Sequence, residues 1–248
     1  MATTLRPGEV VLVGGGPGDP ELITVAGLRA LQQADVIIHD RLGPVSCLDA
    51  LEQNPELINV GKVPRGKFTP QEHINEILID RARAGCKVVR LKGGDSFVFG
   101  RGGEEWVACS EAGVPVRVIP GVTSAVSVPA LAGVPVTHRS LVQGFTVVSG
   151  HVPPDDPRST VDWSALAHAN TTLVLLMAVK YLPQITARLL ESGLAPRTPA
   201  MIVSEGSLPH QSAVLSTLGH VAEDAISQAV TPPAIVVIGE VASLELGA

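Results

Sequence analysis

Short strand patterns alternate with helical patterns along the first 120 residues, and this alternation limits what the chain can fold into. We expect strands at 9–14, 35–39, 57–60, 86–91 and 115–119. Helical spacing of apolar residues separates them at 20–33, 70–84 and 103–112. Strands that alternate with helices predict βα units and a mostly parallel sheet.

The second half of the chain begins again after a break at 120–124, where a small, apolar segment at 125–132 suits a tightly packed helix. We expect strands at 145–149, 172–177, 200–204, 213–216 and 234–239, and helices at 182–192 and 218–225. The closely spaced late strands favour a mixed sheet. The sequence therefore predicts an α/β protein with two α/β domains, 1–120 and 121–248, and a ligand cleft between them.

Composition narrows the class of ligand. The formal net charge is −6, which argues against a general nucleic-acid-binding protein. Nine of the eighteen Lys and Arg residues nevertheless fall within 60–101, a span with only four acids. A local positive region on an acidic protein favours a small anionic ligand. We interpret Arg81, Arg83 and Lys87 not as ligand-binding residues but as solvent-exposed residues of a helix and of the segment that follows it.

Cysteine use and hydropathy indicate the compartment. The three cysteines lack metal-like spacing, which suits reduced thiols in the cytoplasm. The amino-terminal residues lack the pattern of a signal peptide. No apolar run approaches the roughly 18 residues that span a bilayer. We expect a cytoplasmic protein with no membrane contact.

The glycine-rich segment 92–103 is the strongest single indication of a binding site. It follows an expected strand and combines five glycines with Lys92, Asp95 and Arg101. Glycine lets a ligand approach the main chain, and loops at the carboxyl ends of strands commonly bind ligands in α/β sheets. The alternative is a glycine-rich turn beside solvated charges.

A second glycine-rich segment, 13–20, fits neither of two familiar phosphate-binding patterns. Its glycines are spaced by one, and two prolines remove backbone donors, so it is neither a dinucleotide fingerprint nor a Walker A loop. The seven histidines show no metal-binding spacing, and no nucleophile elbow is present. These absences favour a cofactor that carries its own reactivity.

Eight ordered segments carry a family resemblance. They are 11–20 (VLVGGGPGDP), 39–42 (HDRL), 60–62 (VGK), 71–75 (QEHIN), 89–105 (VRLKGGDSFVFGRGGEE), 119–125 (IPGVTSA), 133–139 (GVPVTHR) and 233–240 (PAIVVIGE). Together they resemble the uroporphyrinogen-III C-methyltransferases of the tetrapyrrole methylase superfamily. The chain departs from the family pattern at Ser96, usually proline, in 63–69, which lacks a common histidine, and at Ala178, commonly glycine.

The resemblance implies the tetrapyrrole methylase fold, a homodimer and S-adenosyl-L-methionine as methyl donor, with S-adenosyl-L-homocysteine as product and no metal. It implies methylation of uroporphyrinogen III at C2 and C7, through precorrin-1 to precorrin-2, towards sirohaem and cobalamin. The pattern begins near residue 9, so the amino-terminal dehydrogenase/ferrochelatase module of some members is not expected here. Two alternatives remain: a methylase of a later corrin precursor, and a non-catalytic nucleotide- or tetrapyrrole-binding module. A phosphate-binding oxidoreductase is a more distant third.

The resemblance also implies the site residues. Cofactor contacts are expected from Pro17, Gly93, Gly94, Asp95, Val98, Thr123, Ser124, Met177, Gly206 and Ala234. Asp40 matches the proton acceptor and Lys62 the proton donor. Asp40 could instead pair with Arg41 or cap a helix, and Lys62 could anchor a carboxylate. Met177 could equally be core packing.

Cations are needed to bind a polycarboxylate substrate, and arginine binds carboxylates in a bidentate fork. The candidates are Arg41, Arg65, Lys67, Arg101 and Arg139. Arg139 could pair with a local acid instead, and we interpret His138 as a structural histidine.

Overall fold

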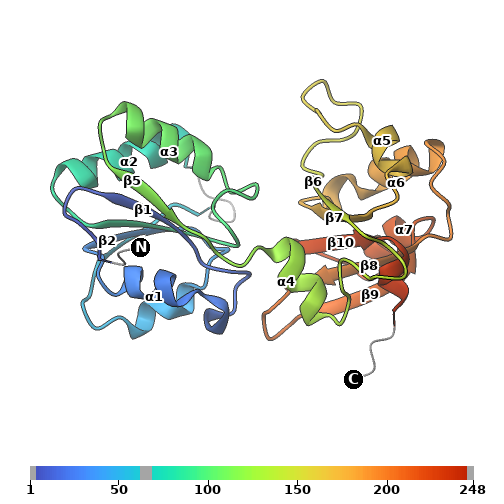
Figure 1. Ribbon diagram of the computed structural model, residues 1–248, viewed down its shortest axis with the longest axis horizontal. Helices are drawn as coiled ribbons and strands as arrows, with labels where there is room; N and C mark the ends of the chain where they lie inside the picture. Colours follow the sequence, from blue (N-terminus) through green and yellow to red (C-terminus); the bar gives the residue numbers. More distant parts are fainter. Residues whose placement is uncertain (1–3, 62–68, 245–248) are drawn as a thin grey trace. The chain divides into compact units, whose positions relative to one another are not determined.

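The computed structural model describes residues 4–61 and 69–244. The chain divides into two compact units, Met1–Thr123 and Ser124–Ala248, and each is described by itself. Both combine a five-stranded sheet with covering helices, which confirms the α/β class expected from the sequence (Figure 1). None of the helices in the described ranges combines the length and apolar character needed to cross a bilayer.

The sheet of unit 1 is entirely parallel, with strand order β3-β2-β4-β1-β5. Its strands are β1 (Val10–Gly14), β2 (Val36–His39), β3 (Glu56–Asn59), β4 (Val88–Lys92) and β5 (Val116–Ile119). All five carboxyl ends therefore lie at one edge, as the βα alternation predicts. The connections contain α1 (Val25–Leu31), α2 (Gln71–Arg83), α3 (Gly102–Glu111) and the 3-10 helices η1 (Pro20–Leu22) and η2 (Val45–Ala50).

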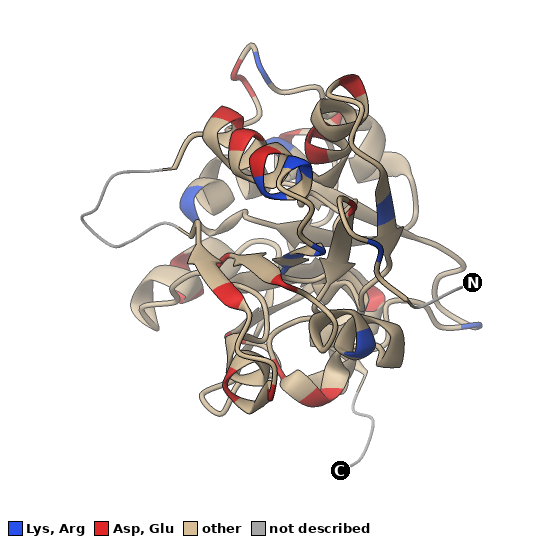
Figure 2. Cartoon of the chain, turned by 90° about the vertical axis from the view of Figure 1, so that its left-hand side faces the viewer, with Lys and Arg blue, Asp and Glu red and all other residues tan. Residues whose placement is uncertain are grey.

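Helices cover both faces of this sheet: α2 and α3 lie on one face and α1 on the other (Figure 1). The strands supply alternating side chains to two apolar clusters, so that Val89 and Leu91 pack on the α1 side. Val88 packs on the α2 and α3 side. Most charged positions lie on helices and loops, but a few basic positions lie on the strands themselves (Figure 2).

One expected helix is divided. The pattern at 20–33 predicts a continuous helix, but η1 ends before Ile23 and α1 begins after Thr24, whose backbone is extended. The Thr24 Oγ1 accepts a hydrogen bond from Gly27 N at 3.1 Å and so caps α1. An N-cap threonine starts a new helix because its side chain satisfies an amide that the first turn leaves free.

Unit 2 holds a mixed sheet with strand order β6-β7-β10-β8-β9. Its strands are β6 (Phe145–Ser149), β7 (Thr172–Leu176), β8 (Pro199–Ser204), β9 (Ser212–Thr217) and β10 (Ala234–Ile238). β6 and β7 are parallel, whereas β10 runs antiparallel to β7 and β8. The mixed sheet expected from the closely spaced late strands is confirmed.

The helices of unit 2 are α4 (Ser124–Leu131), α5 (Trp163–His168), α6 (Leu182–Glu191), α7 (Val221–Ser227) and the 3-10 helices η3 (Val179–Tyr181) and η4 (Glu240–Ser243). α4 packs through Ala125 and Val128 on one face of the sheet. α5, α6 and α7 pack on the other face, where Trp163 and Leu189 are buried. The sequence did not predict α5, because its six residues are too few to show helical periodicity.

Candidate functional site

Three loops meet at the carboxyl edge of the sheet in unit 1. They follow β1, β4 and β5, which are neighbours in the sheet order. The first two loops are joined by a pair of backbone hydrogen bonds between Gly16 and Gly94, at 3.1 and 2.6 Å. A crevice beside the carboxyl ends of neighbouring parallel strands is the usual ligand site of open α/β sheets.

Glycine is required where these loops touch. A Cβ atom added at Gly14 would lie 2.5 Å from the backbone nitrogen of Gly121 and 2.8 Å from the carbonyl oxygen of Gly94. A Cβ at Gly121 would meet the same carbonyl and the backbone of Gly14. The three loops therefore pack main chain against main chain, and we call Gly14, Gly94 and Gly121 the glycine contact.

Asp95 fastens the glycine contact from the loop after β4. Its Oδ2 accepts a hydrogen bond from Gly121 N at 3.0 Å, and its Oδ1 accepts one from Phe97 N at 2.9 Å. The carboxylate is partly buried and keeps further acceptor capacity on both oxygens. It can therefore hold the loops together and still accept hydrogen bonds from a hydroxyl or ammonium group of a ligand.

The rest of the loop after β4 exposes apolar side chains. Phe97 and Phe99 are exposed, and Phe97 packs edge-on against Trp106 with ring centroids 6.1 Å apart. Val98 is half-buried. Ser96 is fully buried, and its hydroxyl has no hydrogen-bond partner in the described part of the chain.

Replacing Ser96 with alanine is expected to raise the free energy of unfolding by about 1 kcal/mol, because a buried hydroxyl without a partner is costly. Urea unfolding of the parent and variant measures the change. A lower stability of Ser96→Ala would show that the hydroxyl makes a bond essential to this loop.

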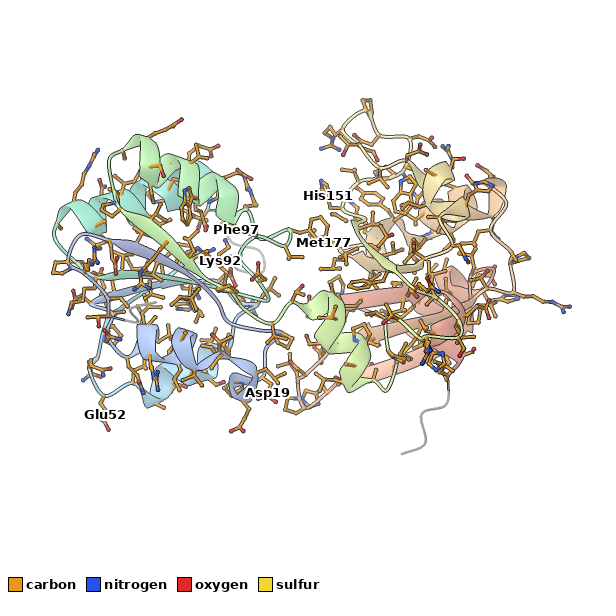
Figure 3. The ribbon with its side chains drawn as sticks, viewed as in Figure 1. Asp19, Glu52, Lys92, Phe97, His151 and Met177 are labelled. Carbon is orange, nitrogen blue, oxygen red and sulfur yellow. The ribbon has the colours of Figure 1, made fainter. Side chains whose placement is uncertain are left out.

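Buried charges lie beneath the same edge. Arg90 and Lys92 of β4 share one face of the strand, and both are buried. Glu105 of α3 is 0% exposed. Its Oε1 accepts hydrogen bonds from Arg90 Nε at 3.0 Å, Lys92 Nζ at 3.0 Å and Gln71 Nε2 at 3.3 Å. Lys92 is labelled in Figure 3.

Asp40 follows β2 and is the partly exposed member of this group, with 24% of its side chain accessible. Its Oδ2 accepts a hydrogen bond from Arg90 Nη2 at 3.2 Å, and its Oδ1 accepts one from Leu42 N at 3.0 Å. The structure thus gives Asp40 a buried arginine partner that the sequence did not predict. We call Asp40, Arg90, Lys92 and Glu105 the buried quartet.

The buried quartet makes stability depend on pH. Burial lowers the pKa of Lys92 below its ordinary value of 10.5, the Arg90 charge lowers that pKa further, and Glu105 opposes the change. Between the lowered pKa and 10.5 the unfolded chain binds a proton that the folded chain has released, so the free energy of unfolding rises with pH. We expect Lys92→Met to flatten this rise in urea unfolding at a series of pH values. Equal slopes in parent and variant would contradict the assignment.

In unit 2 three of the expected site residues lie at one edge of the sheet. Met177 directly follows β7, and Gly206 lies two residues after the end of β8. Ala234 is the first residue of β10, which runs antiparallel to both strands, and it pairs with Ser204 of β8. Met177 is 50% exposed and has a φ of 57°, so core packing does not explain it. Figure 3 shows Met177 and His151 at the same end of this unit.

The remaining cofactor candidates are distributed along the chain. Pro17 is half-buried in the loop after β1, and Gly93 directly follows β4. A Cβ at Gly93 would lie 2.7 Å from the carbonyl oxygen of Leu42, so this position also requires close backbone packing. Thr123 ends unit 1, and Ser124 begins α4 in unit 2.

The cationic candidates have different environments. Arg101 is exposed and forms a bidentate pair with Glu104, at 2.8 and 2.6 Å, which raises the pKa of Arg101. Arg41 and Arg139 are exposed. Half-buried His138 lies in a turn, where its Nδ1 accepts a hydrogen bond from Ser140 N at 3.3 Å. Lys62, Arg65 and Lys67 lie outside the described residues.

Arg90 and Glu105 were missed as members of the site. The sequence does contain an indication of them. Arg90 and Lys92 occupy alternate positions of a buried strand, and buried cations need anionic partners nearby. Among the described residues, no cluster of three or more His, Cys, Asp or Glu side chains could hold a metal ion.

The family model for Tetrapyrrole (Corrin/Porphyrin) Methylases matches residues 9–222. The chain is 46% identical to the uroporphyrinogen-III C-methyltransferase of Methanocaldococcus jannaschii, over 96% of this chain and 98% of that protein. It is 44% identical to the siroheme synthase of Acinetobacter baylyi over 97% of this chain, which spans about half (52%) of that relative's length.

A solved structure has the same fold. The uroporphyrin-III C-methyltransferase of Thermus thermophilus complexed with S-adenosyl homocysteine superimposes with a TM-score of 0.80 and 42% identity, over 94% of this chain and 98% of that one. The two-sheet α/β architecture, the ordered motifs and the match over most of the length all indicate the same family. The chain belongs to the tetrapyrrole (corrin/porphyrin) methylases.

Proposed function

We propose that this chain transfers methyl groups from S-adenosyl-L-methionine to C2 and C7 of uroporphyrinogen III, forming precorrin-2 through precorrin-1. The product lies on the routes to sirohaem and cobalamin. The observation that carries the proposal is the glycine contact fastened by Asp95, because it places an acceptor and close-packed backbone at the carboxyl edge of a parallel sheet. The identity to named methyltransferases over nearly the full chain supports the same reaction.

The donor set of the site suits this cofactor. Asp95 retains acceptor capacity for ribose hydroxyls or the ammonium group, and the hydroxyls of Thr123 and Ser124 can bond polar atoms. Val98 and the exposed Met177 offer apolar surface. In our proposal, Pro17, Gly93, Gly94, Gly206 and the buried Ala234 contribute through main-chain atoms. The sulfonium supplies an activated methyl group when bound, so the protein has mainly to position the reactants and exclude water.

Protons must also be managed, because methylation of a pyrrole carbon changes the protonation of the macrocycle. In our proposal Asp40 accepts the proton. Its carboxylate is partly exposed, while one oxygen is held by Arg90 and the other by Leu42 N. Lys62 donates a proton, in keeping with its motif position. A positioned acid or base contributes typically 10²–10⁴-fold to a rate.

The carboxylates of the substrate bind to basic side chains in this proposal, with Arg41, Arg65, Lys67, Arg101 and Arg139 as candidates. Arg101 is already paired with Glu104 through Nε and Nη2, so in this proposal it binds a substrate carboxylate through its remaining N–H donors or by exchanging Glu104. We further propose that the enzyme works as a homodimer in the cytoplasm, without nucleic-acid or membrane partners.

The proposal is tested with uroporphyrinogen III and methyl-labelled S-adenosyl-L-methionine. We expect label in precorrin-2 and, in calorimetry, binding of S-adenosyl-L-homocysteine. Label transfer only to a later corrin precursor would assign the chain to another methylase of its family. Binding of S-adenosyl-L-homocysteine without any methyl transfer would favour a non-catalytic module.

A further inference from the structure

Glu105 is the centre of the buried quartet, although it is remote from solvent. It is 0% exposed, and the three donors that reach it all share Oε1. Its Oε2 has no partner in the described part of the chain. The carboxylate therefore gathers the two strand cations at one atom instead of spreading its hydrogen bonds over both oxygens.

Arg90 connects this interior carboxylate to Asp40. Its Nε donates to Glu105, and its Nη2 donates to Asp40 Oδ2. Between them, Nη1 donates to the carbonyl oxygens of Leu91 at 2.9 Å and Ile38 at 3.4 Å. All three nitrogens of the guanidinium thus have partners, and because the group is planar, fixing the Nε end fixes the Nη2 end.

The charges of the buried quartet balance, with two cations and two anions. Such a group is seldom the most stable solution for a protein interior, because apolar residues of similar volume commonly do as well or better. Lys92 and Glu105 have almost no exposed side-chain surface, so neither is placed to contact a ligand directly. Their place in the contacts that lead through Arg90 to Asp40 points to a role other than stability.

We propose that Glu105 is a positioning residue, which fixes the Arg90 guanidinium and through it the carboxylate of Asp40. Lys92 neutralises the remaining charge of Glu105 in this arrangement. The inference rests on the proposed role of Asp40 as proton acceptor. With Oδ2 held by Arg90 and Oδ1 by Leu42 N, the free acceptor directions of Asp40 are set by the protein before substrate binds.

The test compares two double variants that differ in whether position 105 offers an oxygen acceptor to Arg90 and to its weaker donor Gln71. K92M/E105Q and K92M/E105L both remove one cation and one anion, so the charge balance is kept in each. The Gln side chain still offers an oxygen to Arg90 Nε, whereas Leu offers none. We expect K92M/E105L to lower the turnover number by about 10²-fold, the cost of a modest misplacement of a reacting group. K92M/E105Q should retain most of the turnover.

The readouts separate positioning from folding. Affinity for S-adenosyl-L-homocysteine should remain near the parental value in both variants, so that the lost activity appears in kcat. The thermal midpoint of K92M/E105L should fall, because buried Arg90 Nε and Gln71 Nε2 lose their acceptor, and kcat is therefore compared at a temperature where both variants are folded. Glu111→Gln, an exposed carboxylate on the same helix, is the control and should not change kcat. If K92M/E105L fails to fold, Glu105→Asp, which withdraws the carboxylate by one methylene, should lower kcat by about tenfold.

Equal turnover in the two double variants, whether high or low, would overturn the proposal, because it would show that the acceptor for Arg90 does not matter. A failure of the proposed function is seen separately. The parent chain would then transfer no label to uroporphyrinogen III, or Asp40→Asn would retain full turnover.

Discussion

Replacing Asp40 with asparagine should lower the turnover number for methylation of uroporphyrinogen III by about 10²–10⁴-fold, the usual contribution of a positioned base. Asparagine keeps an oxygen that can accept the Leu42 N hydrogen bond, so the turn after β2 is preserved. It can no longer accept a proton. Single-turnover assays with labelled S-adenosyl-L-methionine measure the chemical step directly.

The controls for this variant address charge and binding. Asp40→Asn leaves Arg90 facing a neutral group, so its thermal midpoint has to be measured with its activity. Asp49→Asn removes an exposed carboxylate in the same unit and should leave the rate unchanged. Affinity for S-adenosyl-L-homocysteine should be retained. An Asp40→Asn variant with parental turnover would remove Asp40 from the mechanism.

Gly121→Ala should lower the free energy of unfolding by about 3 kcal/mol, the upper part of the usual range for overpacking. The added methyl would collide with the backbone of Gly14 and the carbonyl of Gly94, and neither neighbour can turn aside as a side chain could. Separation of the loops also breaks the hydrogen bond from Gly121 N to Asp95, so cofactor affinity should fall. Urea unfolding and calorimetry measure the two effects.

Gly103→Ala is the matched control for this variant. Its Cβ would have no atom within 4 Å, and it lies in the first turn of α3. Alanine should therefore stabilise the chain, by up to about 1 kcal/mol. Equal free energies of unfolding for Gly121→Ala and Gly103→Ala would contradict our description of the three loops as packed backbone against backbone.

The fold was largely predictable because hydrophobic periodicity decides it. Each expected strand is found within a few residues of its predicted bounds, since buried runs such as Val10–Gly14 have no competing pattern. The errors have local causes. Thr24 caps a new helix inside the expected range 20–33, and α5 is too short to be recognised.

The site was predictable only where its residues follow strands. Asp40 and Asp95 were identified in this way and through the family resemblance. The partnership of Arg90 with Asp40 depends on the register of β2 against β4, which places Ile38 opposite Arg90. That register brings together residues fifty positions apart, and no local pattern encodes it. Glu105 is likewise positioned only by the packing of α3 on the sheet.

The reversed direction of β10 has a practical consequence. β10 begins with Ala234, at the edge of its sheet where Met177 lies, and ends with Ile238 at the opposite edge. The chain then turns through η4 on that opposite side. A label attached within η4 would therefore lie at the edge away from Met177, which recommends this segment for labelling or immobilisation.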